Sequence, residues 1–180
     1  AKDVLKGTGI QVASTLNFPQ ANDTLDMKLA ALKEMIKTGV DQFDFPPNPG
    51  LLIGGEEKAY FEEMKQIVEV AHASGVIVKS MLEFGFLNEE QKKKAAQLAC
   101  EAGIDWVKQS SGWGVGGCAA TVEDVKILKE NISLPCRVKV SGKVNSLEKM
   151  KMMFEAGAEL VGASSGPEII EGLIGDPNAY

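Results

Sequence analysis

The chain has 180 residues, of which 44% are hydrophobic, enough for one well-packed domain and too few for two. A net charge of -6 and a pI near 4.9 argue against a surface that binds nucleic acid or anionic membranes. No run of about 18 apolar residues and no signal-peptide pattern is present, so we expect a soluble, cytoplasmic protein.

The cysteines and the single histidine favour neither a metal site nor a Ser-His or Cys-His nucleophile. Cys100, Cys118 and Cys136 are odd in number and lack short metal-binding spacing, which favours reduced thiols over a disulfide framework. His72 lies near the end of a predicted helix, where we expect a surface residue rather than a ligand or base. We therefore predict no metal site.

Short β-rich runs alternate with longer helical patterns along the whole chain. After a helix end at 1–7, the predicted strands are 9–16, 41–46, 76–83, 105–111, 137–141 and 160–165. The predicted helices are 24–38, 56–74, 89–102, 122–131, 147–156 and 167–173. Six βα units in series predict one α/β domain over 1–180, with a parallel sheet that is either doubly wound or part of a barrel.

Residues that favour helix ends separate these elements. Thr121, Asn88 and Ser146 are suitable N-caps, because their side-chain oxygens can accept from the first backbone N–H groups of a helix. Four glycines follow helical patterns at positions where a left-handed conformation ends a helix: Gly39, Gly75, Gly103 and Gly157.

Charged side chains occur inside several predicted strands, although strands covered on both faces are normally apolar throughout. Alternation places Asp44 opposite Phe43 and Phe45. Applied to the other strands, it gives one face that carries Asp44, Lys79, Glu83, Lys108, Arg137 and Lys139. A barrel interior explains this face better than an open sheet does. The alternatives are a salt-bridge layer without a catalytic role and wrongly assigned strand faces.

Lys108 is the residue on this face that we expect to carry chemistry. A lysine at its ordinary pKa of about 10.4 is protonated and is not a nucleophile. Burial and a neighbouring cation both favour the neutral amine, which can form a Schiff base with a carbonyl group. Lys139, on the next predicted strand, would supply that cation, and Asp44 would move protons. This route needs neither a metal ion nor a cofactor.

Three small, donor-rich segments follow predicted strands and are candidates for binding phosphate: 110–117, 141–143 and 162–167. The last segment leads into a predicted helix with Pro167 near its start, so free backbone N–H groups would face an anion. The last two strands of a (β/α) barrel are a frequent place for a phosphate site. Lys143 adds a positive charge to this region.

These segments together resemble the deoxyribose-phosphate aldolase family over residues 9–166. Residues 107–112, Val-Lys-Gln-Ser-Ser-Gly, are similar to the V-K-T-S-T-G motif that carries the family's Schiff-base lysine. Residues 138–142, Val-Lys-Val-Ser-Gly, resemble the K-A-S-G-G motif that carries its second lysine. Residues 41–44 and 162–165 resemble its D-E-hydrophobic-D strand and its phosphate-binding turn.

The resemblance implies a TIM-type (β/α) barrel that reversibly cleaves 2-deoxy-D-ribose 5-phosphate to D-glyceraldehyde 3-phosphate and acetaldehyde. Lys108 would form the Schiff base, Lys139 would be its electrostatic partner, and Asp44 would relay protons. The residues implied in binding the sugar phosphate are Ser111, Gly112, Gly142, Lys143, Gly162, Ser164 and Ser165. Further candidates are Lys79, Glu83 and the terminal Tyr180. The implied partners are sugar phosphates and aldehydes, and a homo-oligomer is compatible with the pattern.

The sequence departs from the family in three respects. Gln109 replaces a threonine, and Lys143 and Asn145 stand where the family has glycine and arginine. The family's first two βα units have no counterpart, and about six units cannot close an eight-stranded barrel, so we expect an incomplete barrel. The chain is then a fragment, pairs with another copy or is a degenerate relative. The alternative functions are an inactive sugar-phosphate-binding relative and a class I aldolase with another substrate.

Overall fold

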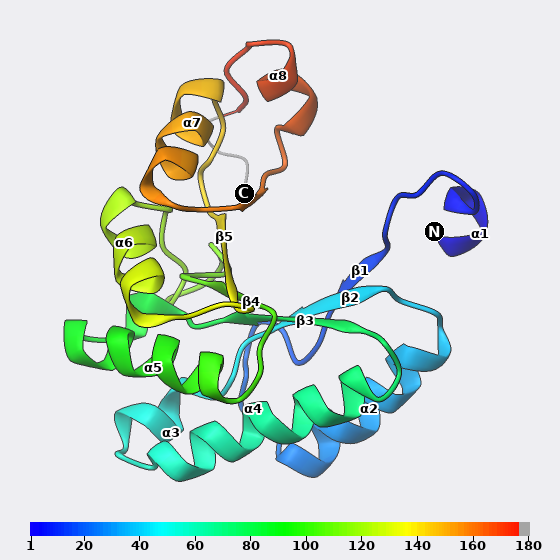
Figure 1. The fold of residues 1–180 in the computed structure, drawn as a ribbon, viewed down its shortest axis with the longest axis vertical. Coiled ribbons are helices and arrows are strands. Elements are labelled where there is room, and N and C mark those ends of the chain that lie inside the picture. The colour runs from blue at the N-terminus through cyan, green and yellow to red at the C-terminus, as the bar shows by residue number, and fades with distance from the viewer. Residues whose placement is uncertain (177–180) are drawn as a thin grey trace.

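The computed structural model describes residues 1–176, and its centre is one sheet of six parallel strands (Figure 1). The strands pair in chain order as β1 (Ala13–Thr15), β2 (Gln42–Phe45), β3 (Ile77–Met81), β4 (Trp106–Lys108), β5 (Arg137–Ser141) and β6 (Leu160–Gly162). Each one lies within a predicted strand range. The predicted parallel sheet is therefore confirmed, and Tyr180 lies outside the described residues.

The sheet curls into a half-barrel. Within residues 1–176, β1 pairs only with β2, and β6 pairs only with β5. Figure 1 shows an open, curved layer with α2 (Leu25–Lys37) and α4 (Glu57–His72) along its outer side. The expected incomplete barrel of about six βα units is confirmed.

The remaining helices follow the predicted alternation, with two additions. They are α1 (Lys2–Leu5), α3 (Pro49–Ile53), η1 (Phe84–Phe86), α5 (Glu89–Glu101), α6 (Val122–Asn131), α7 (Leu147–Ala156) and α8 (Gly166–Ile170). The sequence interpretation missed α3 and the short 3-10 helix η1. For α3 a signal was available, because the side chain of Asn48 caps the helix and Pro49 stands in its first turn.

The helix ends form as predicted. Asn88 accepts from the backbone N–H of Gln91 in a complete capping box. Thr121 and Ser146 accept in the same way at the starts of α6 and α7. The four predicted glycines all have positive φ, which a residue with a side chain adopts only at a cost. These local signals fix where each helix turns back toward the next strand.

The two faces of the sheet differ in character, as the alternation predicts. Phe43, Val78, Val107 and Val138 are fully buried and belong to the hydrophobic core that includes the helices. The residues next to them along the strands project from the opposite, concave face: Asp44, Lys79, Lys108 and Lys139. The fold therefore directs one carboxylate and three ammonium groups into the half-barrel.

Arg137 does not join this group, so its predicted place in the interior is wrong. It begins β5 at the amino end, with 53% of its side chain exposed and 3.7 Å between its Nε and a carboxylate oxygen of Glu159. Its guanidinium lies over the ring of Trp106, 5.5 Å from the centroid. Alternation predicted the face of the sheet correctly but did not give the position along the barrel axis.

His72 ends α4, and its Nε2 lies 2.9 Å from a carboxylate oxygen of Asp105, which agrees with the predicted surface position. The three cysteines are free thiols. Among residues 1–176, no cluster of three or more His, Cys, Asp or Glu side chains is arranged to hold a metal ion. No helix in the same range combines the length and apolar character that crossing a membrane requires.

Candidate active site

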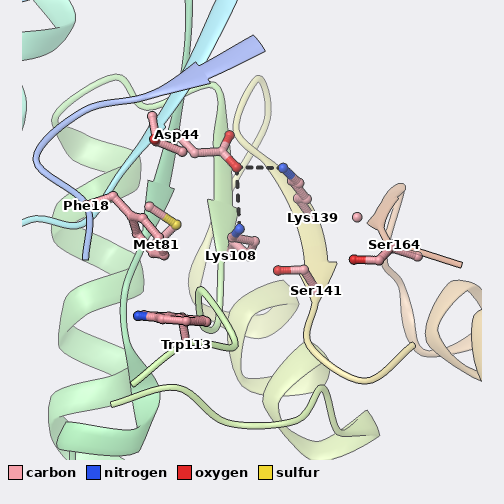
Figure 2. A pocket seen from close by; sticks show the side chains of 11 residues that line it. Phe18, Asp44, Met81, Lys108, Trp113, Lys139, Ser141 and Ser164 are labelled. Carbon is pink, nitrogen blue, oxygen red and sulfur yellow. Dashed lines mark hydrogen bonds and ion pairs between the residues drawn. The ribbon is translucent and has the colours of Figure 1, made fainter. Parts of the chain in front are cut away.

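Asp44 is the centre of the charged group inside the half-barrel (Figure 2). Its Oδ2 accepts from Lys139 Nζ at 2.6 Å and from Lys108 Nζ at 3.4 Å. Its Oδ1 lies 3.4 Å from Lys79 Nζ. Asp44, Lys79 and Lys108 are buried, and Lys139 is 14% exposed at its side chain. The structure thus brings together the three predicted catalytic residues and Lys79, which the sequence analysis names as a further candidate.

Strand register explains this convergence. Asp44 on β2 is the register partner of Lys79 on β3, and Lys108 on β4 is the partner of Lys139 on β5. Register partners on neighbouring parallel strands project from the same face, and the curvature of the sheet turns these faces toward one another. Two pairs of adjacent strands therefore produce one cluster.

The four charges influence one another strongly. Burial of Asp44 disfavours its ionised form, but the fields of Lys139, Lys108 and Lys79 outweigh it, so the pKa of Asp44 lies below its ordinary value. For Lys79, burial is the largest influence and lowers the pKa, although the nearby Asp44 carboxylate opposes it. At neutral pH the cluster therefore contains an ionised carboxylate that can bind ammonium groups and exchange protons with them.

A cavity of about 450 Å³ opens beside these residues. It is lined by Thr15, Phe18, Asp44, Met81, Lys108, Trp113, Lys139, Ser141, Gly162, Ala163 and Ser164. In Figure 2, the apolar side chains of Phe18, Met81 and Trp113 lie on one side of Lys108, and the hydroxyls of Ser141 and Ser164 lie on the other. The cavity therefore has an apolar wall and a polar wall, with Lys108 and Lys139 between them.

Two residues of the predicted phosphate group line this cavity. A Cβ atom on Gly162 would lie 3.3 Å from Lys139 Cε and from Ser141 Cβ, so glycine keeps this part of the cavity open. Ser164 follows in the loop after β6, where it is exposed to solvent. These two residues provide small, polar surroundings at the end of the last described strand.

The other five predicted phosphate residues are outside the cavity lining, as far as residues 1–176 show: Ser111, Gly112, Gly142, Lys143 and Ser165. The Oγ of Ser111 accepts from the backbone N–H of Trp113 at 3.1 Å, which is a contact within its own loop. At Gly142, with φ +98°, a Cβ atom would lie 2.6 Å from the carbonyl oxygen of Cys118. Ser111 and Gly142 therefore serve loop packing in this structure.

Lys143 and Ser165 also make contacts within the local fold. Lys143 is exposed and has φ +58°, and its carbonyl oxygen accepts from Lys149 Nζ at 3.0 Å. Ser165 is buried at the start of α8, where a Cβ atom on Gly175 would overlap its side chain. Sequence spacing placed both residues near strand ends, but it could not predict how the following segments fold over them.

Glu83 organises the loop that follows β4. Its Oε1 accepts from the backbone N–H of Ser111 at 2.8 Å, and its Oε2 accepts from the hydroxyl of Ser110 at 3.4 Å. Burial raises the pKa of Glu83, and the hydrogen bonds from Ser111 oppose that rise. The sequence placed Glu83 beside Lys79, but its carboxylate accepts both hydrogen bonds from the loop that carries Trp113. Glu83 therefore shapes a cavity wall.

The sequence patterns did not predict the apolar wall of the cavity as part of the site. Met81 could have been identified from the sequence, because it is two residues after Lys79 and so lies on the same face of β3. Phe18 and Trp113 lie in loops, whose side-chain directions no periodic pattern gives. Ser141 shares a face with Lys139, and it begins the segment 141–143, which the sequence predicts as a candidate for binding phosphate.

No family sequence model matches the chain. A deoxyribose-phosphate aldolase from Thermococcus kodakarensis is 38% identical over 174 residues, which cover 96% of this chain and 77% of that protein. A deoxyribose-phosphate aldolase from Staphylococcus carnosus is 41% identical over 177 residues, covering 98% of this chain and 78% of that protein.

Solved structures agree with these sequence relatives. The tetrameric deoxyribose phosphate aldolase of Aeropyrum pernix superimposes with a TM-score of 0.85 at 26% identity, covering 94% of this chain and 70% of that chain. Both sequence relatives are more than 30% identical over three-quarters of their own lengths, and the half-barrel matches this solved structure in fold. The chain therefore belongs to the deoxyribose-phosphate aldolase family.

Proposed function

We propose that this chain is a class I aldolase that reversibly cleaves 2-deoxy-D-ribose 5-phosphate to D-glyceraldehyde 3-phosphate and acetaldehyde. The observation that carries the proposal is the placement of Lys108, buried at the cavity and 3.4 Å from the carboxylate that also binds Lys139. Relatives named deoxyribose-phosphate aldolase support the same reaction. Lys108, Lys139 and Asp44 are the proposed catalytic residues.

Lys108 is the proposed nucleophile. Its neutral Nζ adds to the aldehyde carbon C1 of the open-chain sugar, and loss of water gives a protonated Schiff base. Removal of the proton on the C3 hydroxyl then breaks the C2–C3 bond, and its electron pair moves into the Schiff base to form an enamine. The C3–C5 fragment leaves as glyceraldehyde 3-phosphate. Protonation of C2 and hydrolysis release acetaldehyde and restore Lys108, so no cofactor is consumed.

Asp44 and Lys139 are the proposed proton-transfer pair. The 2.6 Å contact between Lys139 Nζ and Asp44 Oδ2 allows one proton to pass between them without a rearrangement of the strands. Because Asp44 also reaches Lys108, the same carboxylate can serve the carbinolamine and enamine stages. The positive charge of Lys139 lies on the strand next to Lys108, beside the proposed reacting group. Lys79 Nζ lies 3.4 Å from the second carboxylate oxygen and forms an ion pair with it.

The phosphate of the substrate is proposed to bind at the polar wall, where Ser164 and the backbone at Gly162 line the cavity. The C1 aldehyde then reaches Lys108, and the apolar wall encloses the opposite side of the substrate. Ser111, Gly112, Gly142, Lys143 and Ser165 stay in the proposal as residues that form the surrounding loops. A cytoplasmic location and a homo-oligomeric state belong to the proposal too, and light scattering tests the latter.

The test is an assay of 2-deoxy-D-ribose 5-phosphate cleavage, with release of glyceraldehyde 3-phosphate as the readout. Wild type should be active, and Lys108→Met should lose activity by a factor of at least about 10³. Lys94→Met is the matched control, because Lys94 lies on the outer helix α5 and pairs with Glu57 at the surface. Full activity of Lys108→Met would overturn the proposal. Inactive wild type that still forms a Schiff base would indicate another aldolase substrate.

A further inference from the structure

A second buried ion pair lies away from the Asp44 cluster and takes no part in the proposed chemistry. Lys28 on α2 and Glu63 on α4 are 1% and 5% exposed, and the distance between Lys28 Nζ and Glu63 Oε1 is 2.8 Å. Burial raises the pKa of Glu63, against the attraction of Lys28. A buried ion pair between two packed helices is not required for stability, because apolar side chains of similar volume fill such sites equally well.

Both members of the pair also bind the backbone of loops at the active-site end of the sheet. Lys28 Nζ donates to the carbonyl oxygen of Ala21 at 2.6 Å, in the loop after β1. Glu63 Oε1 accepts from the backbone N–H of Asn48 at 3.0 Å, in the turn after β2. The ion pair therefore joins two helices to two loops, and an apolar pair could not make either backbone contact.

The loop after β1, which Lys28 contacts at Ala21, has an unfavourable backbone conformation at two residues. Asn17 and Ala21 both have positive φ, +50° and +62°, although neither is glycine. The backbone N–H of Ala21 donates to the carbonyl oxygen of Asn17 at 3.0 Å, which closes the loop around Phe18. A non-glycine residue keeps a positive φ only where contacts with the rest of the structure stabilise it. Lys28 holds the far end of this loop, and Phe18 within it lines the cavity beside Lys108 (Figure 2).

We propose that Lys28 and Glu63 are positioning residues of the aldolase site, which fix the apolar wall of the cavity through Phe18. The inference rests on the proposed function, and neither residue touches the substrate in it. Loss of the pair releases the loop, so Phe18 no longer faces Lys108 in one orientation. Displacing a substrate-positioning wall by about 1 Å is enough to lower kcat/KM up to about a hundredfold.

Hydrogen exchange tests the structural half of this inference without any substrate. Lys28→Met alone leaves a buried carboxylate without its partner, so the double variant Lys28→Met/Glu63→Leu is used to keep the helices packed. Peptides covering residues 16–24 should exchange faster in the double variant than in wild type. Peptides covering β4 and β5 should be unchanged. Unchanged exchange at 16–24 would contradict the inference, whatever the activity of the enzyme.

A double-mutant cycle with Phe18→Ala tests the functional half. If the ion pair acts through Phe18, the Lys28→Met/Glu63→Leu variant should lose about tenfold or more in kcat/KM, chiefly through a higher KM. In the Phe18→Ala background, the same two substitutions should lower kcat/KM by less than about twofold. Lys28→Arg, which keeps the charge, should retain most of the activity. Losses that multiply fully in the Phe18→Ala background would refute the inference, whereas inactive wild type would refute the proposed function instead.

Discussion

Lys108 and Lys139 are register partners on the neighbouring strands β4 and β5, and both ammonium groups contact the same oxygen of Asp44. Their two Nζ atoms must therefore lie within about 6 Å of each other, a separation at which like charges repel each other. The shared carboxylate keeps the pair together despite this repulsion. One strand pairing thus places the proposed nucleophile, Lys108, beside a second ammonium group.

Replacing Lys139 with leucine should remove that charge while keeping most of the side-chain volume. We expect turnover near neutral pH to fall at least about a hundredfold, because the proposed nucleophile Lys108 would lose the cation beside it. Steady-state rates near neutral pH measure this effect. Wild-type turnover in the variant would contradict the pairing.

Replacing Asp44 with asparagine should destabilise the protein, because three lysines would lose their common carboxylate. We expect a loss of about 3–5 kcal/mol in the free energy of unfolding near neutral pH. The folded-state pKa of Asp44 is lowered from 3.8, so its contribution is fully present above 3.8 and is lost as the pH falls through the folded value. Denaturant unfolding should therefore show the difference between wild type and variant shrinking below pH 3.8. A difference independent of pH would disagree with this.

Replacing Trp113 with alanine should change substrate selection rather than stability, because 57% of this residue is exposed while its ring lines the cavity. We expect the free energy of unfolding to stay within about 0.5 kcal/mol and KM for the sugar phosphate to rise several-fold. Bulkier aldehydes should be accepted more readily. Val115→Ala is the control, since Val115 is on the same loop, is 93% exposed and is outside the main cavity lining. Equal effects of both variants would exclude a specific role for Trp113.

Cys136 should be inert toward thiol reagents in the folded protein. It is 3% exposed, and burial, together with the nearby Cys100, raises its pKa to about 12. At about pH 8, only about one such thiol in ten thousand is ionised. Counting labelled thiols by mass should give at most two in the native protein and three in denaturant. Labelling of Cys136 at the rate of Cys100 would show that the start of β5 opens.

The order of strands and the charged cluster around Asp44 were predictable because both depend on periodicity. Alternation along a strand determined that Asp44, Lys108 and Lys139 share a face, and the parallel order of βα units made the strands of Lys108 and Lys139 neighbours. The same reasoning placed Arg137 on this face, yet it lies at the other end of β5, because alternation does not measure depth. That residues 1–180 form one domain stays a prediction.

Loop residues were harder to predict, because their directions depend on long-range contacts. Glu83 has φ +50° and binds the backbone of Ser111, which is 28 residues farther along the chain. Nothing in a local pattern shows that this carboxylate supports the loop that carries Trp113. The Lys28–Glu63 ion pair illustrates the same limit, since a buried lysine on an amphipathic helix looks like a surface residue in sequence.

Reduction with borohydride in the presence of acetaldehyde identifies the lysine that forms the Schiff base. We expect one ethyl group to be added to Lys108, located by peptide mass mapping, and none to be added to the Lys108→Met variant. Lys139→Leu should still be labelled at Lys108, but more slowly. Lys108 is not the Schiff-base residue if no adduct forms, if the ethyl group maps to Lys79 or Lys139, or if labelling persists in Lys108→Met.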